Sequence, residues 1–247
     1  MPSLPASDIP ALTKDQMVEV DRLMVDVYGV SLLQMMENAG RHLAALARAR
    51  FLNGNPAGRT VVVLAGRGGN GGGALVAARN LCNWGADVTV ITSRPPETFS
   101  GVPGHQLEIL RRLPVTIRDA QTLSEPPAVR SADLLIDGLI GYSLAGAPRG
   151  AAADLIRLAN AQTAPTLALD TPSGLNITTG DAYAPTVRAA ATMTLALPKH
   201  GLLTAAARPH VGDLYLADIS VPPGLYKSLD MALPPIFARS PILHLTL

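Results

Sequence analysis

Three short loops of the sequence carry the residues that could do chemistry, and each of them follows an apolar run. The first is GRGGNGGG at residues 66–73, in which only Arg67 and Asn70 have side chains. Its G-x-G-x-x-G spacing matches the fingerprint of dinucleotide-binding loops. Glycines leave backbone amides bare and allow tight turns with positive φ, and the helix that follows offers free N–H groups to a phosphate. This loop therefore predicts contact with a phosphorylated ligand such as a nucleotide.

Asp137 and Asp170 begin the other two loops, DGLIGYSLAG and DTPSG. Ligands of parallel sheets gather beyond the carboxyl ends of the strands, so both carboxylates are expected in one crevice. There they can hold a cation or hydroxyl groups, or move a proton; the alternative is that each aspartate only caps a neighbouring turn. Ser173 has no G-x-S-x-G elbow around it, so a cation ligand is a better interpretation than a hydrolase nucleophile. Lys199, at the end of the later run LALPK, either reaches the same crevice or is solvated.

The elements that must position these loops alternate along the chain. Apolar residues at helical spacing predict two helices between Thr13 and Phe51, separated at Gly29. The apolar runs TVVVLAG, ADVTVITS, PVTIRD, ADLLIDGLIG and PTLALDTPSG predict five strands, with two more in ATMTLALPKHG and DLYLADISVP. Further helices are expected over about residues 72–84, 104–113 and 149–162.

Most of the strand sequences are continuous apolar runs rather than alternating ones, which is typical of a parallel sheet covered on both faces. We therefore expect an α/β fold that is Rossmann-like, with a mostly parallel central sheet covered by helices on both faces and a helical N-terminal extension. The length suits a single domain over residues 1–247, with residues 1–11 and 228–247 as flexible or docking tails.

Composition argues against several classes of function. The 20 basic and 19 acidic residues leave a net charge of +1 and are scattered along the chain, which argues against nucleic-acid binding through a large basic surface. No segment approaches the ~20 consecutive apolar residues that span a bilayer, and the N-terminus lacks the pattern of a signal peptide. The single cysteine, Cys82, excludes a disulfide within the chain and predicts a cytoplasmic location.

Five segments, in order, carry a family resemblance. They are the N-terminal helices with the motif MENAG at residues 36–40, the loop GRGGNGGGALVAARNL, the loops DGLIGYSLAGAPRG and LDTPSGLNITTG, and the final strands in LALPKHGLLTAAARPHVGDLYLADISVP. Over residues 12–222 the chain resembles the YjeF N-terminal domain family, whose enzymatic members are NAD(P)H-hydrate epimerases. The resemblance implies a Rossmann-like fold, often a homodimer, that interconverts the R and S forms of hydrated NADH and NADPH.

The resemblance also implies the residues of the site. A potassium ion would be held by Asn70, Asp137 and Ser173, whose amide, carboxylate and hydroxyl oxygens suit a hard cation. Asp170 is expected to touch the reacting end of the substrate as a catalytic residue, and Asp137 is the second carboxylate available, assigned mainly to the cation. The implied substrate-binding residues are Gly69, Asn70, Gly71, Gly72, Gly73, Gly141, Tyr142, Ser143, Leu144, Ala145, Gly146, Ala147 and Asp170.

The glycine loop departs from the family pattern G-P-G-N-N-G-G-D-G. Gly69 stands where the family has its first asparagine, and Gly73 stands where it has its aspartate. Two hypotheses follow: an isomerase that epimerises hydrated NADH and NADPH, or a catalytically degenerate YjeF-type domain that binds a nucleotide-like ligand or protein partners. An ordinary NADP oxidoreductase is disfavoured, because the second strand ends in Thr92-Ser93-Arg94 without the acidic residue that holds a ribose.

Overall fold

The β-branched apolar runs of the sequence form the strands of one sheet. The computed structural model describes residues 1–122, 129 and 131–247. Nine strands of this part of the chain lie in the order β1-β9-β8-β7-β6-β5-β2-β3-β4, and every neighbouring pair is parallel except β8 and β9. The strands are β1 (Ser3–Pro5), β2 (Thr60–Ala65), β3 (Asp87–Thr92), β4 (Thr116–Asp119), β5 (Leu134–Gly138), β6 (Thr166–Leu169), β7 (Ala191–Leu195), β8 (Asp213–Ala217) and β9 (Ile242–Thr246).

Local capping residues determine where the first two helices begin. The side chains of Thr13 and Ser31 each accept a hydrogen bond from the backbone three residues on, and a glutamine side chain there bonds back, so both helices begin with a capping box. The helices are α1 (Lys14–Asp26), α2 (Leu32–Arg50), α3 (Gly69–Asn83), α4 (Gly101–Leu110), α6 (Gly150–Asn160), α7 (Arg208–Val211) and α8 (Pro223–Ser228).

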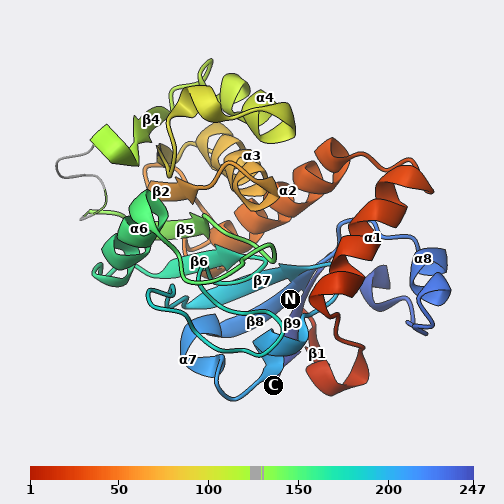
Figure 1. Cartoon of the computed structure of the whole chain (residues 1–247). Helices are drawn as coiled ribbons and strands as arrows, with labels where there is room; N and C mark the ends of the chain where they lie inside the picture. Colours follow the sequence, from red (N-terminus) through yellow and green to blue (C-terminus); the bar gives the residue numbers. More distant parts are fainter. Residues whose placement is uncertain (123–128, 130) are drawn as a thin grey trace.

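Helices cover both faces of the sheet (Figure 1). Alternate residues of a strand point to opposite faces, so Val61 and Val63 of β2 join the core beneath α2, α3 and α4, while Val62 and Leu64 join the core beneath α6. On the second face, α1 and α8 pack with inward residues of β8. The expected α/β fold, with a mostly parallel sheet between helical layers and a helical N-terminal extension, is confirmed.

The order of the strands brings the three candidate loops together. From β2 the chain adds β3 and β4 on one side, and it then crosses back to add β5, β6 and β7 on the other. The strand order therefore reverses between β2 and β5, and ligands of open α/β sheets bind at such a point, beyond the carboxyl ends. The loops after β2, β5 and β6 all leave from that edge.

Two boundaries differ from the sequence-based expectation. Helix α3 begins at Gly69 rather than near residue 72, so most of the glycine stretch is the first turn of a helix. The two ends of the chain form strands, with β1 parallel to β9 and β9 antiparallel to β8 (Figure 1). Neither strand was expected, because both are short and contain or adjoin prolines.

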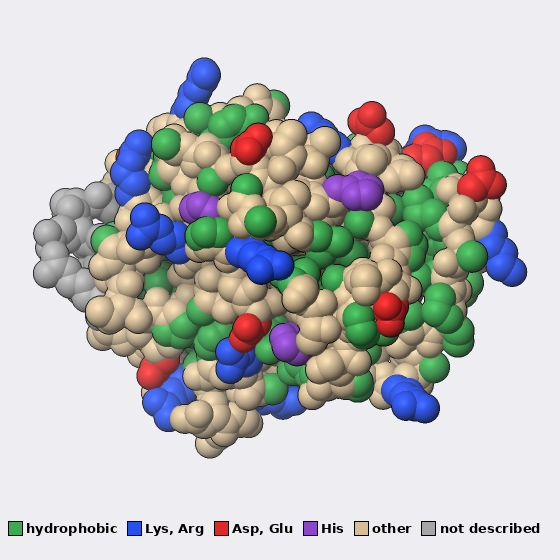
Figure 2. All heavy atoms as spheres, turned by 90° about the horizontal axis from the view of Figure 1, so that it is seen from below, with side chains coloured by type: hydrophobic (Ala, Val, Ile, Leu, Met, Phe, Trp, Pro, Cys, Tyr) green, Lys and Arg blue, Asp and Glu red, His purple; other side chains and the backbone are tan. Residues whose placement is uncertain are grey.

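The surface agrees with the scattered charge of the sequence. On the face in Figure 2, acidic and basic side chains are intermixed. Among the described residues, no helix combines the length and the apolar character that crossing a bilayer requires.

Candidate functional site

A cavity of about 550 Å³ opens at the carboxyl edge of the sheet, a volume that suits a small-molecule site. Its wall is built by α1, α2, the loop after β2, the starts of α3 and α4, the loop after β5 and the ends of β6 and β7. Much of the wall is apolar, with three methionines from α1 and α2. The predicted site residues on the wall are Gly69, Asn70, Gly73, Gly141, Tyr142, Ser143 and Asp170.

The other predicted residues lie away from that wall. Gly71, Gly72 and residues 144–147 do not line the cavity, while Asp137 and Ser173 are fully buried beneath the loops. The structure thus separates the predicted set into a layer that a substrate can touch and a layer behind it.

Backbone crowding, rather than φ, explains the glycines that the fold requires. A Cβ atom at Gly66 would lie 1.9 Å from the backbone oxygen of Leu139, and one at Gly71 would lie 1.6 Å from that of Gly66. The positive φ expected for this stretch is wrong, since none of its glycines is among the positive-φ residues. Gly68 and Gly69 are different, because a Cβ atom there meets nothing closer than 3.7 Å. These two glycines and Asn70 therefore present the bare end of α3 to the cavity.

Gly73 is coupled to the strand that carries Asp170. A Cβ atom at Gly73 would lie 2.8 Å from Cδ2 of Leu169, the last residue of β6. Leu169 therefore occupies space that a side chain at position 73 would need. The space that the family's aspartate would need at position 73 is thus partly filled by the apolar side chain of Leu169.

Asp137 and Ser173 form a buried polar pair. Ser173 Oγ donates to Asp137 Oδ1 at 2.7 Å, and the Ser173 amide donates to Oδ2 at 2.8 Å. Burial raises the pKa of Asp137, and the Ser173 and Leu139 hydrogen bonds partly oppose that rise. None of the ion pairs among the described residues involves Asp137. A fully buried carboxylate with only neutral donors needs either a proton or a cation.

Asn70 lies on the cavity wall and contacts the loop that follows Asp137. Its Nδ2 atom is buried and has no hydrogen-bond partner among the described residues. A Cβ atom at Gly141 would lie 3.3 Å from Asn70 Cγ and 3.5 Å from Oδ1, so the amide lies against the loop that follows Asp137. The Nδ2 atom is an N–H donor and cannot bind a cation, so only Oδ1 of Asn70, together with the Asp137 carboxylate and the Ser173 hydroxyl, offers the oxygen ligands that a hard cation takes.

Asp170 reaches the cavity wall with Lys199 behind it. The Lys199 side chain is fully buried, and its Nζ donates to Asp170 Oδ1, to Thr194 Oγ1 at 3.2 Å and to the backbone oxygen of Leu195 at 2.9 Å. These acceptors satisfy all three N–H groups of the ammonium. Of the two alternatives for Lys199, the solvated one is wrong, because its side chain has no exposed surface.

The backbone also holds Asp170 in place. Its φ is +64°, a left-handed conformation that costs energy for most residues other than glycine and that asparagine and aspartate tolerate best. All of its side-chain hydrogen bonds within the described residues involve Oδ1. Oδ2 is therefore left available to a ligand in the cavity.

Sequence reasoning missed Asp21, which also lines the cavity. Tyr142 Oη donates to Asp21 Oδ2, which joins α1 to the loop after β5. Asp21 lies four residues after Met17 and three before Met24, both buried, so it is an acidic residue beside the apolar stripe of a helix. An acidic residue at such a position was the sequence signal that could have identified Asp21 as a site residue.

The comparisons with known proteins agree with this architecture. The family model for the YjeF-related protein N-terminus matches residues 32–201. The chain is 43% identical over 219 residues to an NAD(P)H-hydrate epimerase of Dehalogenimonas lykanthroporepellens, covering 88% of this chain and 85% of that protein. It is 39% identical to an NAD(P)H-hydrate epimerase of Truepera radiovictrix, covering 87% and 90% of the two chains.

Two further proteins are similar to this chain, one of them much longer than the chain and the other less similar in sequence. A bifunctional NAD(P)H-hydrate repair enzyme of Salinibacter ruber is 36% identical, and the match covers 87% of this chain but 41% of that enzyme. The crystal structure of yeast ynu0 superposes with a TM-score of 0.80 at 22% identity, covering 96% of this chain and all of that one, which shows a shared fold. From the family match and these identities, the chain belongs to the family of the YjeF-related protein N-terminus.

Proposed function

We propose that this chain interconverts the R and S forms of hydrated NADH and NADPH. The observation that carries the proposal is the position of Asp170 on a cavity whose other wall is the bare amide end of α3. The cavity thus offers a phosphate-binding wall and a carboxylate within one site. The names of the relatives, which are epimerases or repair enzymes for this substrate, support the same function.

The proposed mechanism assigns one task to each wall. The amides at Gly68–Asn70 hold the phosphates of the dinucleotide, which fixes the hydrated nicotinamide ring against the far wall. In the ring-opening route, Asp170 Oδ2 takes the proton of the hydroxyl group while the ring C–N bond at that carbon breaks, and returns it when the bond re-forms on the other face of the carbonyl. In the hydroxyl-loss route, the same carboxyl gives its proton to the hydroxyl, which leaves as water, and takes a proton back from the water that adds to the other face. Lys199 holds Oδ1 and so keeps the other oxygen aimed into the cavity.

A potassium ion is the proposed cofactor, and Asn70, Asp137 and Ser173 would hold it. The fully buried Asp137 carboxylate, whose hydrogen-bond donors are all neutral, supports this assignment. When bound, the ion supplies positive charge that balances Asp137. The chain's own contribution is to join the loops after β2, β5 and β6 through these three side chains.

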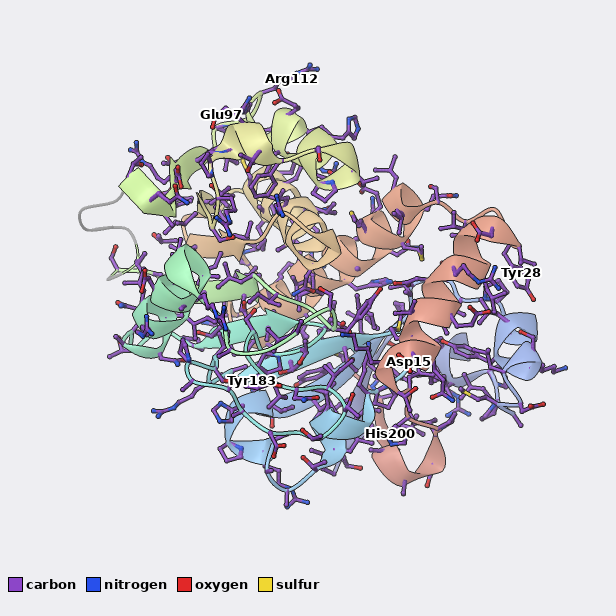
Figure 3. All side chains as sticks on the ribbon, in the orientation of Figure 1. Asp15, Tyr28, Glu97, Arg112, Tyr183 and His200 are labelled. Atoms are coloured by element: carbon purple, nitrogen blue, oxygen red, sulfur yellow. The ribbon has the colours of Figure 1, made fainter. Side chains whose placement is uncertain are left out.

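A homodimer is the proposed assembly. Several large apolar side chains are exposed along α1 and at the start of α2: Val18, Val25, Val27, Tyr28, Leu32 and Leu33. Leu32 also lines the cavity, so a second copy on this patch would lie beside the cavity mouth. Tyr28, at one end of the patch, is labelled in Figure 3. A cytoplasmic location stays a prediction from the single Cys82.

The alternative function is a binding domain without catalysis. The observation that favours it is the replacement of a loop carboxylate by Gly73, with Leu169 filling the adjacent space. Such a domain would bind a nucleotide-like ligand or a protein partner through the same cavity but would not change the stereochemistry of the hydrate.

A coupled assay tests the proposal. The R form of hydrated NADH is supplied with an S-specific dehydratase in potassium buffer, and recovery of NADH absorbance is followed. The protein should accelerate recovery, Asp170→Asn should abolish the acceleration, and Asp181→Asn, at an exposed aspartate, should retain it. Recovery at the spontaneous rate with the wild-type protein would overturn the proposal. NADH binding in that case would favour the alternative.

A further inference from the structure

One hydrogen bond on the cavity wall joins segments far apart in the sequence. Tyr142 follows β5 and Asp21 belongs to α1, 121 residues earlier, and both line the cavity. The phenol is the donor and the carboxylate is the acceptor. A hydrogen bond to a charged acceptor is roughly twice as strong as one between neutral groups. The contact therefore fixes the loop after β5 against α1.

The electrostatics keep the donor and acceptor roles in place. Burial raises the pKa of Tyr142, and its hydrogen bond to Asp21 and the charge of Asp21 raise it further, so the phenol keeps its proton. Burial also raises the pKa of Asp21, the Tyr142 hydrogen bond lowers it, and the charges of Asp170 and Lys199 act on it in opposite directions. The Asp21–Tyr142 pair is thus close enough to the Asp170–Lys199 pair to feel its charges.

Because its hydroxyl proton is donated to Asp21, Tyr142 cannot donate a hydrogen bond to a ligand, and its ring is the large surface that it can present. The side chain is half-buried and packs against the apolar cluster that α1 shares with the sheet. Its neighbours Gly141 and Ser143 also line the cavity, so this part of the loop is continuous wall. A flat apolar ring of this kind stacks on planar heterocycles.

We propose that Asp21 is a positioning residue, which holds the ring of Tyr142 as the face against which the hydrated nicotinamide ring packs. This inference rests on the proposed function. It assigns the nicotinamide end rather than the adenine end, because Asp21 and Tyr142 line the same cavity as Asp170, the group that moves the proton. The phosphates lie at the separate wall formed by the amide end of α3.

Two probes of different chemistry test the assignment. NADH and ADP-ribose share the adenosine and the phosphates, and only NADH carries the nicotinamide ring. Binding of each is measured by calorimetry for wild type, Tyr142→Leu, Tyr142→Phe, Asp21→Ala and Asp21→Asn. We expect Tyr142→Leu to weaken NADH binding about tenfold, a usual effect of losing one stacking side chain, and to change ADP-ribose binding less than about twofold.

Kinetics and stability separate positioning from folding. Tyr142→Phe and Asp21→Ala should each lower kcat about tenfold, the factor typical for a lost hydrogen bond to a charged group. The double variant should be no worse than either single variant, because one interaction is lost in all three. Asp21→Asn keeps an acceptor oxygen and should recover most of kcat. The control variants Asp15→Asn and Tyr183→Phe change residues that do not line the cavity and should match wild type; both residues are labelled in Figure 3.

The outcomes distinguish this inference from the proposed function. Equal weakening of NADH and ADP-ribose by Tyr142→Leu, or no weakening of either, would overturn the inference while epimerase activity stands. The expected binding pattern in a protein without epimerase activity would support the ring contact and overturn the proposed function. A wild-type protein that binds neither probe would overturn both.

Discussion

The buried pair of Asp170 and Lys199 allows a quantitative prediction about stability. In Lys199→Met, a side chain of similar length replaces the ammonium and leaves Asp170, which is 4% exposed, as an unpaired buried carboxylate. Its remaining hydrogen bonds, from Thr194 Oγ1 and the Leu195 amide, are both 3.3 Å long. Removing one partner of a buried ion pair costs about 3–5 kcal/mol. For a chain of this size that lowers Tm by roughly 6–20 °C.

A second variant separates the loss of the charge partner from the loss of packing. Asp170→Asn with Lys199→Met removes the unpaired charge, and asparagine tolerates the φ of +64°. The double variant should recover more than half of the lost stability.

Urea unfolding at equal ionic strength measures both variants, with Lys227→Met, at an exposed lysine on α8, as the matched control. The reasoning is refuted if Lys199→Met unfolds within about 1 kcal/mol of wild type, or if the double variant is less stable than Lys199→Met alone.

Three further predictions follow from the buried layer and from the glycines. Replacing a large organic cation by potassium at constant ionic strength should stabilise the fold at pH 7 and so raise Tm. The gain in free energy of unfolding is about 2.7 kcal/mol when the ion is at one hundred times its Kd. Because burial raises the pKa of Asp137, its ionisation destabilises the ion-free fold as pH rises, so the potassium effect should shrink as pH falls and the carboxyl protonates; an effect independent of pH would contradict the assignment. Gly66→Ala should destabilise by more than about 3 kcal/mol, since its Cβ atom would meet a backbone oxygen, whereas Gly69→Ala should change stability by less than about 1 kcal/mol, and equal losses in thermal unfolding would disprove the crowding argument. Gly73→Asp should cost about 1–3 kcal/mol by overpacking against Leu169, and Leu169→Val should relieve that cost; a rise in epimerase rate in the double variant would mean that the natural loop limits catalysis.

The glycine stretch shows how far the sequence could be interpreted. Its spacing indicated a close approach of backbone beside a strand end, and the structure contains one. The partner in that approach is mostly protein, since Gly66 and Gly71 face the backbone oxygens of Leu139 and Gly66. Spacing alone cannot separate a glycine that admits a ligand from one that admits a neighbouring loop, because both need the same missing side chain.

Local patterns were sufficient for the elements of the fold. Continuous apolar runs, capping residues at Thr13 and Ser31, and the alternation of strands with helices depend on residues close together in the chain, so the sequence alone determined a mostly parallel sheet between helical layers. The short strands at the two ends of the chain were not predicted, because their pairing joins residues 3–5 to 244–246 and leaves no local signal.

Only the tertiary structure decided how the chemical groups meet. It buried Lys199 against Asp170, joined Asp137 to Ser173, and linked Asp21 to Tyr142 across 121 residues. Each of these contacts depends on the order in which strands join the sheet and on which helix covers which face. A polar side chain far along the chain acquires its partner only when those elements pack, which is why the residue types were readable beforehand and their pairing was not.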